Sequence, residues 1–359
     1  MLQALLTDIP DGRRMTEDEA ARLLSVRGRD VWAIAAAADR VRAEGVGEAV
    51  TWVCNQNLNV TNICVNACEF CGFSRKNGDP EAYFHSVDEV VSRLRAARGR
   101  GVTEICTVSG LHPGFTADDY IDLIRLIRQE APDVHVHASN PQEVAYAAAR
   151  SGMTTAEVLS ALKQAGLGSL CGTAAEVLVD RVREEICPGK IDTAEWVRII
   201  TEAHRMGIPS TATLLYGHIE TAADIARHLS IIREIQDDTG GFTEFVPLSF
   251  IPWTTPLYLS GRAPAGATGR LDVLVYAVAR LFLDTVPHLQ ASWVKLGTKM
   301  AQVALMSGAD DLGGTMYEES ISKGAGAAGT DYLDPTEMRR IAEDIGRPLL
   351  QRTTLYAVP

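Results

Sequence analysis

Short strand-like runs alternate with helix-length amphipathic segments from about Leu58 onward, and this alternation limits the folds open to the chain. Candidate strands lie at 57–63, 103–109, 133–138, 168–171, 210–215, 243–249, 288–292 and 310–314. Helical patterns lie between them, at 87–99, 117–130, 154–165, 193–206, 221–238, 268–285 and 297–307. Strand-then-helix alternation implies parallel strands joined by crossover helices. About 250 residues of it is the size of a (β/α)8 barrel, so we expect an α/β barrel of this TIM type.

An open doubly wound sheet is the competing fold, but its usual Gly-x-Gly-x-x-Gly after the first strand is missing. No Ser-, Gly- or Pro-rich linker divides the 359 residues, so we expect one main domain with extensions. Helix-forming sequence at 16–47, opened by a capping signature at Thr16, predicts an N-terminal helical extension over 1–50. The barrel is then expected over 51–325, with a C-terminal extension over 326–359.

Composition restricts the cellular setting and the ligands. Four of the seven cysteines stand alone without disulfide-like spacing, and we expect them to be buried small hydrophobic residues rather than ligands: Cys54, Cys106, Cys171 and Cys187. The N-terminus lacks the basic segment of a signal peptide, and no apolar run reaches the roughly 18 residues of a membrane span. A cytoplasmic protein without membrane contact is predicted. The net charge of −12 argues against nucleic-acid binding and favours small-molecule substrates.

The other three cysteines form a C-x3-C-x2-C run, Cys64, Cys68 and Cys71, just after the first candidate strand. Three thiolates leave one iron of a 4Fe–4S cluster without a protein ligand, so a small chelating molecule can bind there. This arrangement resembles that of radical S-adenosylmethionine (SAM) enzymes, which also place an aromatic residue before the last cysteine, here Phe70. The alternative is a structural zinc knuckle, which needs a fourth ligand at short spacing. The nearest downstream histidine is His85, and no second C-x2-C occurs.

In a barrel, functional side chains gather in the loops that follow the strands. Ser109 and Gly110 follow the second candidate strand, where the radical SAM pattern exposes backbone groups to the methionine amine. His137 and Asn140 follow the third; we leave His137 open between a substrate contact and a hydrogen-bonded core histidine. Glu176 follows the fourth and is expected in the first turn of a helix, either capping it or binding SAM.

The fifth junction holds Gly217, His218 and Glu220, where a glycine allows a ligand to approach the backbone closely. The alternative there is an ordinary turn and helix cap. Glu244 lies in the following strand, on the face opposite Phe245. Which of these two faces is buried stays open from the sequence.

Nearly the whole chain, from about Trp52 to Tyr356, resembles the tyrosine-using subunit of deazaflavin (FO) synthase, the CofH family. The matching stretches include Asn-Val-Thr-Asn-Ile-Cys at 59–64, Gly-Thr-Ala-Ala-Glu at 172–176, Ile-Cys-Pro-Gly-Lys-Ile at 186–191, Tyr-Gly-His-Ile-Glu-Thr at 216–221, Gln-Ala-Ser-Trp-Val-Lys-Leu-Gly at 290–297 and Asp-Leu-Gly-Gly-Thr-Met-Tyr at 311–317. Related aminofutalosine-type enzymes share the cysteine motif, but their C-terminal motifs differ.

The resemblance implies a 4Fe–4S cluster and SAM as cofactors. SAM cleavage would give a 5′-deoxyadenosyl radical that abstracts hydrogen from tyrosine, and the 4-hydroxybenzyl fragment would join C5 of 5-amino-6-(D-ribitylamino)uracil. Partners would be an electron donor and a separate radical SAM enzyme that closes the deazaflavin ring, because only one C-x3-C-x2-C occurs here.

We assign no catalytic residue from the sequence. The expected SAM-binding residues are Phe70, Ser109, Gly110, Glu176, Gly217 and Glu220, and the expected substrate-binding residues are His137, Asn140, His218, Glu244, Trp293, Lys295 and Glu318. The chain departs from the family pattern at three strand ends, with Val-Ser-Gly at 108–110, Ser-Asn-Pro at 139–141 and Leu-Cys-Gly at 170–172. A paralogue of the same family acting on other substrates is therefore the alternative reading.

Overall fold

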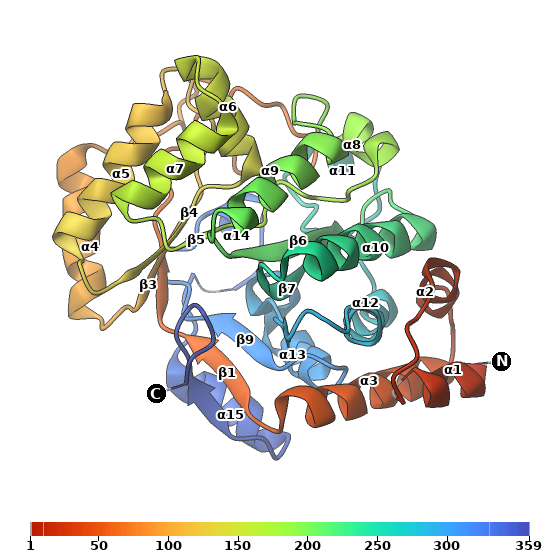
Figure 1. Ribbon diagram of the computed structural model, residues 1–359. Helices are drawn as coiled ribbons and strands as arrows, with labels where there is room; N and C mark the ends of the chain where they lie inside the picture. Colours follow the sequence, from red (N-terminus) through yellow and green to blue (C-terminus); the bar gives the residue numbers. More distant parts are fainter. Residues whose placement is uncertain (1, 10, 330, 359) are drawn as a thin grey trace.

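The computed structural model describes residues 2–9, 11–329 and 331–358, and a curved parallel sheet forms its centre (Figure 1). Each strand of this sheet pairs in parallel with the next one along the chain. The sheet contains, in order, β2 (Asn55–Asn57), β3 (Glu104–Thr107), β4 (His135–Ala138), β5 (Ser169–Leu170), β6 (Ser210–Tyr216), β7 (Phe242–Ser249) and β8 (His288–Leu289).

A smaller parallel sheet closes the ring. Its order is β10 (Leu349–Gln351), β1 (Val50–Val53) and β9 (Asp311–Gly314). Only Cys54 separates β1 from β2, so one extended segment belongs to both sheets. On the other side, a bridge between Gln290 and Asp311 joins the end of β8 to β9. The strands therefore surround a common interior, and the expected α/β TIM-type barrel is confirmed.

Helices cover the outside of the strands (Figure 1). They are α4 (Val87–Gly99), α5 (Ala117–Glu130), α6 (Pro141–Ser151), α7 (Thr155–Ala165), α8 (Asp180–Ile186), α9 (Thr193–Arg205), α10 (Ala222–Thr239), α12 (Gly269–Phe282) and α13 (Trp293–Leu305). Two short helices, α11 (Pro256–Leu259) and α14 (Ile321–Gly324), lie in the loops after β7 and β9. Among the described residues, no helix is both long enough and apolar enough to cross a lipid bilayer.

The chain ends pack against this barrel. The N-terminal helices are α1 (Leu2–Asp8), α2 (Glu17–Leu24) and α3 (Asp30–Val46), of which α2 packs on α10 and α3 on α12. The capping signature is confirmed, since Thr16 Oγ1 accepts a hydrogen bond from Glu19 N–H and Glu19 accepts one from Thr16 N–H. After α15 (Pro335–Asp344), β10 pairs with β1, so the C-terminal segment contributes a strand next to the barrel.

The expected helices agree with the structure to within a few residues, but the first strand does not. We expected it at 57–63, whereas β2 ends at Asn57. The following residues form single bridges to loops, Thr61 with Phe84 and Ile63 with Arg75. Thr61 Oγ1 also donates to Tyr83 O, at 2.6 Å. The β-branched run therefore anchors loops at the barrel mouth, and this tertiary role overrides its strand propensity.

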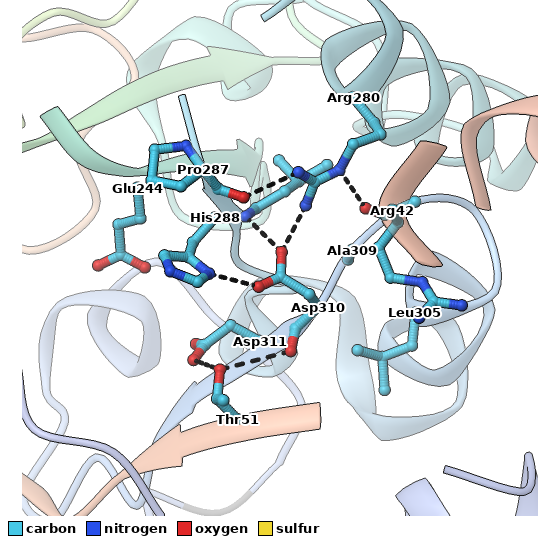
Figure 2. Close-up of polar contacts among 12 residues, drawn as sticks. Arg42, Thr51, Glu244, Arg280, Pro287, His288, Leu305, Ala309, Asp310 and Asp311 are labelled. Carbon is cyan, nitrogen blue, oxygen red and sulfur yellow. Dashed lines mark hydrogen bonds and ion pairs between the residues drawn. The ribbon is translucent and has the colours of Figure 1, made fainter. Parts of the chain in front are cut away.

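Two adjacent buried carboxylates hold the seam between β8 and β9 (Figure 2). Asp310 accepts from Arg280 and from His288 Nδ1, the latter at 2.7 Å. Asp311 accepts from Thr51 Oγ1 at 2.6 Å, and Arg352 Nη2 donates to it at 3.1 Å. Buried charges need such partners because removing a lone ion from water costs several kcal/mol. The network therefore ties β1, β8, β9 and the C-terminal tail together.

The C-terminal tail also contacts the interior of the barrel. The ring of Tyr356 stacks on His288 with centroids 3.6 Å apart. Its hydroxyl donates to Glu244 Oε2 at 2.7 Å, and Gln290 Nε2 donates to the same oxygen at 3.0 Å. Glu244, on β7, is therefore buried in a polar layer beneath Gln290.

Candidate active site

A cavity of about 340 Å³ opens where the barrel strands end. Its walls come mainly from the segments that follow the strands, as expected for the functional end of such a barrel. The lining includes Cys64, Cys68, Phe70, Cys71, Ser109, Gly110, Asn140, Glu143, Thr173, Glu176, Lys190, Phe250, Ser292, Lys295 and Met316. Residues from loops far apart in the sequence thus surround one space.

The three motif cysteines all face this cavity from one irregular loop. The loop is anchored by its backbone: Cys64 N–H donates to Arg75 O at 3.1 Å, and Glu69 N–H donates to Ile186 O at 2.8 Å. Burial raises the pKa of Cys64, and raises that of Cys68 to about 12. Both thiols are therefore neutral unless a cation stabilises their thiolates. Three clustered thiols on a fixed loop have the chemistry that an iron–sulfur cluster with one open iron requires.

A buried ion pair stands beside the cysteine loop. Lys190 Nζ lies 2.6 Å from Glu176 Oε1 and 5.2 Å from the centroid of the Phe70 ring. The expectation that Glu176 lies in the first turn of a helix is wrong, because α8 begins only at Asp180. Glu176 instead has a φ of +47°, in the left-handed region. The N-cap of α8 is Val179, so Glu176 does not cap this helix, and it lines the cavity instead.

Ser109 and Gly110 form a close contact between the β3 loop and the cysteine segment. Ser109 Oγ accepts from Val60 N–H at 2.8 Å, and Gly110 N–H donates to Thr61 O at 2.8 Å. A Cβ on Gly110 would lie 2.3 Å from Ile63 O, closer than any side chain allows. Only glycine permits this approach.

Several residues of the cavity wall were not expected from the sequence, and the charged ones Glu143 and Lys190 are among them. Glu143 Oε1 accepts from Ser109 N–H at 3.2 Å, while Oε2 is buried without a hydrogen-bond partner in the described part of the chain. Burial raises the pKa of Glu143 to about 8. In the sequence it resembles an ordinary acidic residue in the first turn of a helix after Asn140-Pro141, so no local signal marked it. Lys190 belongs to a stretch of the family resemblance but had no assigned role.

Several expected ligand residues lie outside this cavity lining. Gly217, His218 and Glu220 form a turn after β6, in which Glu220 accepts from the Gly217 and His218 N–H groups at 2.5 and 2.9 Å. Trp293 Nε1 donates to Gly314 O at 2.9 Å, and Glu318 pairs with Arg93 and Arg100 near the surface. Ligand contacts at these positions stay predictions, as does one by Glu244.

Three other expected substrate residues differ in their placement. Lys295 lines the cavity, and its ammonium group has no hydrogen bond or ion pair with the described residues; burial lowers its pKa. Asn140 lines the cavity and also caps α6, since its Oδ1 accepts from Glu143 N–H at 3.1 Å. His137 is buried, with Nδ1 2.7 Å from Ser169 Oγ, and burial lowers its pKa to about 4.

Comparisons with known proteins support the interpretation of the cysteine loop and of the barrel. The model of the radical SAM superfamily matches residues 58–232, and that of the CofH/MqnC C-terminal region matches residues 239–356. A protein of Methanosphaerula palustris named 5-amino-6-(D-ribitylamino)uracil--L-tyrosine 4-hydroxyphenyl transferase is 65% identical over 99% of this chain and 97% of its own length. The chain belongs to the CofH family of radical SAM enzymes.

Members of this superfamily bind a 4Fe–4S cluster and SAM, and the thiol set of the cavity suits those cofactors. A longer relative, FO synthase of Mycobacterium tuberculosis, is 44% identical over 96% of this chain, which covers 40% of that protein. Among solved structures, the hydrogenase maturase HydG is similar with a TM-score of 0.78 at 19% identity, covering 98% of this chain and 76% of the other. Methylornithine synthase (PylB) has a TM-score of 0.73 at 16% identity, covering 96% and 97%. These two similarities show that this CofH family member shares its fold with HydG and PylB.

Proposed function

We propose that this chain transfers the 4-hydroxybenzyl group of L-tyrosine to 5-amino-6-(D-ribitylamino)uracil in deazaflavin (FO) synthesis. The observation that carries the proposal is the 65% identity with a transferase of that name over nearly the full length of both chains. A match of this extent includes the loops that form the cavity as well as the barrel that supports them.

The proposed cofactor contacts all line the cavity. Cys64, Cys68 and Cys71 are the proposed cluster ligands, and Phe70, Ser109, Gly110 and Glu176 are the proposed SAM contacts. When bound, the cluster and SAM together supply a carbon radical able to abstract hydrogen. Gly217 and Glu220 remain proposed SAM contacts, although they act from a turn outside the cavity lining.

The protein's own contribution is orientation and exclusion of water, because a carbon radical attacks any nearby group. Apolar residues supply much of the wall: Val108, Leu111, Leu215, Leu248, Phe250 and Ile251. Asn57 and Thr173 line the same space, and their side-chain oxygens, Asn57 Oδ1 and Thr173 Oγ1, are buried without a hydrogen-bond partner among the described residues. A buried polar atom left unpaired costs roughly 1–3 kcal/mol. A ribityl chain with its many hydroxyls would supply the missing partners.

The positive charge of Lys295 gives the cavity a site for a carboxylate. Both tyrosine and SAM carry one, and Lys190 is already paired with Glu176. Substrate contacts by Asn140, His137, His218, Glu244, Trp293 and Glu318 remain part of the proposal. Ring closure is assigned to a separate radical SAM enzyme, because this sequence holds a single C-x3-C-x2-C motif. An electron donor completes the system.

The reaction is tested by anaerobic incubation of the reconstituted enzyme with SAM, a reductant, ribitylaminouracil and tyrosine labelled in its ring. The expected product is a uracil adduct that carries the ring label, with one 5′-deoxyadenosine formed per adduct, measured by mass spectrometry. Deoxyadenosine without a labelled adduct would contradict the proposed substrates and favour a paralogue acting on another pair. The strand-end departures at 108–110 and 139–141 would then be the first positions to revert.

The cluster ligands are tested separately. Cys68→Ala should abolish both cluster absorbance and SAM cleavage, because only three protein thiols hold the iron. Cys54→Ala is the matched control, since Cys54 is also buried but lies between β1 and β2. It should leave cluster absorbance and SAM cleavage largely intact. SAM cleavage retained in Cys68→Ala would disprove the ligand assignment.

A further inference from the structure

A second group of thiols lies on and directly after the barrel strands rather than on the cysteine loop. In the described part of the chain, one ligand atom each from Cys106, His137 and Cys171 lies within 4.8 Å of the other two. Cys106 is on β3, His137 is its register partner on β4, and Cys171 directly follows β5. Three neighbouring strands therefore bring two thiol sulfurs and one imidazole nitrogen close together. Two thiols and an imidazole are the donors that zinc prefers.

The two thiols are poorly placed to form a disulfide instead. Strand β4 lies between β3 and β5, because β3 pairs with β4 and β4 with β5. Neighbouring strands are about 4.8 Å apart, so the two Cα atoms are separated by roughly 9–10 Å. A disulfide needs its Cα atoms within about 7 Å. A cation between the sulfur atoms does not need the backbones to approach.

The hydrogen bonds of His137 leave one ring nitrogen ready for a metal. Ser169 Oγ lies 2.7 Å from His137 Nδ1 and 2.8 Å from His135 Nε2. Two opposite proton arrangements satisfy both contacts, and a metal on His137 Nε2 selects the one in which Nδ1–H of His137 donates to Ser169 Oγ and the Ser169 hydroxyl donates to His135. Nε2 of His137 then keeps its lone pair. Metal-binding histidines usually have such a partner on the second nitrogen, which fixes the orientation of the ring.

The surroundings suit a cation. Glu104, two residues before Cys106 on the same face of β3, is a buried carboxylate whose Oε1 accepts from Asn55 Nδ2 at 3.1 Å. Asn57 is the register partner of Cys106 and is buried. Asn57 and Cys106 both line the reaction cavity, and Asn57 Oδ1 has no hydrogen-bond partner among the described residues. This oxygen is available to a fourth ligand or to a metal-bound water.

We propose that Cys106, His137 and Cys171 form a binding site for Zn²⁺ whose fourth position opens to the reaction cavity. Binding replaces the two thiol protons, which are released to solvent, while the histidine binds as a neutral ligand. The resulting centre, one Zn²⁺ with two thiolates, has no net charge. Three protein ligands with one open position are the pattern of zinc sites that bind a further small ligand. The site shares His137 with the proposed substrate contacts, but it is tested by metal content, so its failure can be told apart from failure of the proposed reaction.

The test uses the full-length protein with its cluster reconstituted. Protein is incubated anaerobically with zinc, freed of loose metal on a chelating column, and analysed for zinc and iron. We expect zinc in a one-to-one ratio with the chain. Cys106→Ala and Cys171→Ala should lose that zinc and keep their iron, whereas the control Cys54→Ala should keep both. Ser169→Ala removes the partner of His137 and should weaken zinc binding about 10–100-fold.

A second measurement separates this site from the cysteine loop. A full-length triple variant carries Cys64→Ala, Cys68→Ala and Cys71→Ala together. Added Co²⁺ should give this triple variant the visible absorption of tetrahedral cobalt bound to thiolates. Adding Cys171→Ala to this variant should remove the absorption. Zinc that is absent from the wild-type protein, or that persists in Cys171→Ala, would overturn the proposal, as would cobalt absorption unaffected by Cys171→Ala.

Discussion

At the scale of single residues, the ion pair of Glu176 and Lys190 places a carboxylate in the cavity beside the cysteine loop. A charge-assisted hydrogen bond from this carboxylate to SAM is worth roughly 1.5–3 kcal/mol. Glu176→Gln should therefore weaken SAM binding more than about tenfold, measured by equilibrium binding at constant iron content. Glu185→Gln, on an exposed position of α8, should leave SAM affinity unchanged. Equal affinity in Glu176→Gln would mean that Glu176 serves only as the partner of Lys190.

Glu143 should make stability depend on pH. Burial raises its folded-state pKa to about 8, whereas a glutamate in an unfolded chain titrates near about 4.3. The stability it contributes is therefore fully present below about pH 4.3 and is lost as the pH rises through about 8. Glu143→Gln keeps the acceptor for Ser109 N–H but does not titrate.

The stability of Glu143→Gln relative to wild type should therefore increase by a few kcal/mol between about pH 5 and 8. Urea unfolding at a series of pH values measures this difference. Using Glu185→Gln as the reference variant corrects for the general effect of losing a carboxylate. A difference between Glu143→Gln and wild type that does not change with pH would contradict the shifted pKa.

At the scale of elements, Asn140 joins a helix to the cavity because it caps α6 and also lines the wall. Asn140→Ala should lower the free energy of unfolding by about 1 kcal/mol, whereas Asn140→Ser retains a capping oxygen and should cost little. Asp192→Ala removes the cap of α9, outside the cavity lining, and is the matched control for stability. If Asn140 also binds substrate, both of its variants should raise KM for ribitylaminouracil. An unchanged KM in both would leave it only the capping role.

At the scale of the whole molecule, the C-terminal tail is held in place by a buried pair. The side chains of Arg352 and Asp311 are 2% and 0% exposed, so removing one partner leaves an unpaired charge. Arg352→Leu should lower the free energy of unfolding by about 3–5 kcal/mol, measured by urea denaturation. Arg340→Leu breaks an exposed pair with Glu337 and should cost less than about 1 kcal/mol. Similar losses in both variants would show that the tail is not a structural part of the barrel.

Local patterns in the sequence were enough to predict most of the helices, the cap at Thr16 and the parallel barrel. The helices and the cap depend on residues close together in the sequence, through the periodic spacing of apolar side chains and hydrogen bonds in the first helical turn. The spacing of Cys64, Cys68 and Cys71 likewise predicted their chemistry, because all three lie on one short loop. The family resemblance, carried by stretches along the chain, was confirmed by the relatives.

Only the tertiary structure decided the contacts between distant segments. Arg352 and Asp311 are 41 residues apart in the sequence, and Cys106, His137 and Cys171 meet only because β3, β4 and β5 are neighbours. Glu143 resembles a routine acidic residue at a helix start until the barrel buries it. Glu176 looked like a helix residue but adopts a left-handed conformation. Burial and strand neighbourhood depend on the folded chain as a whole, so no local pattern encodes them.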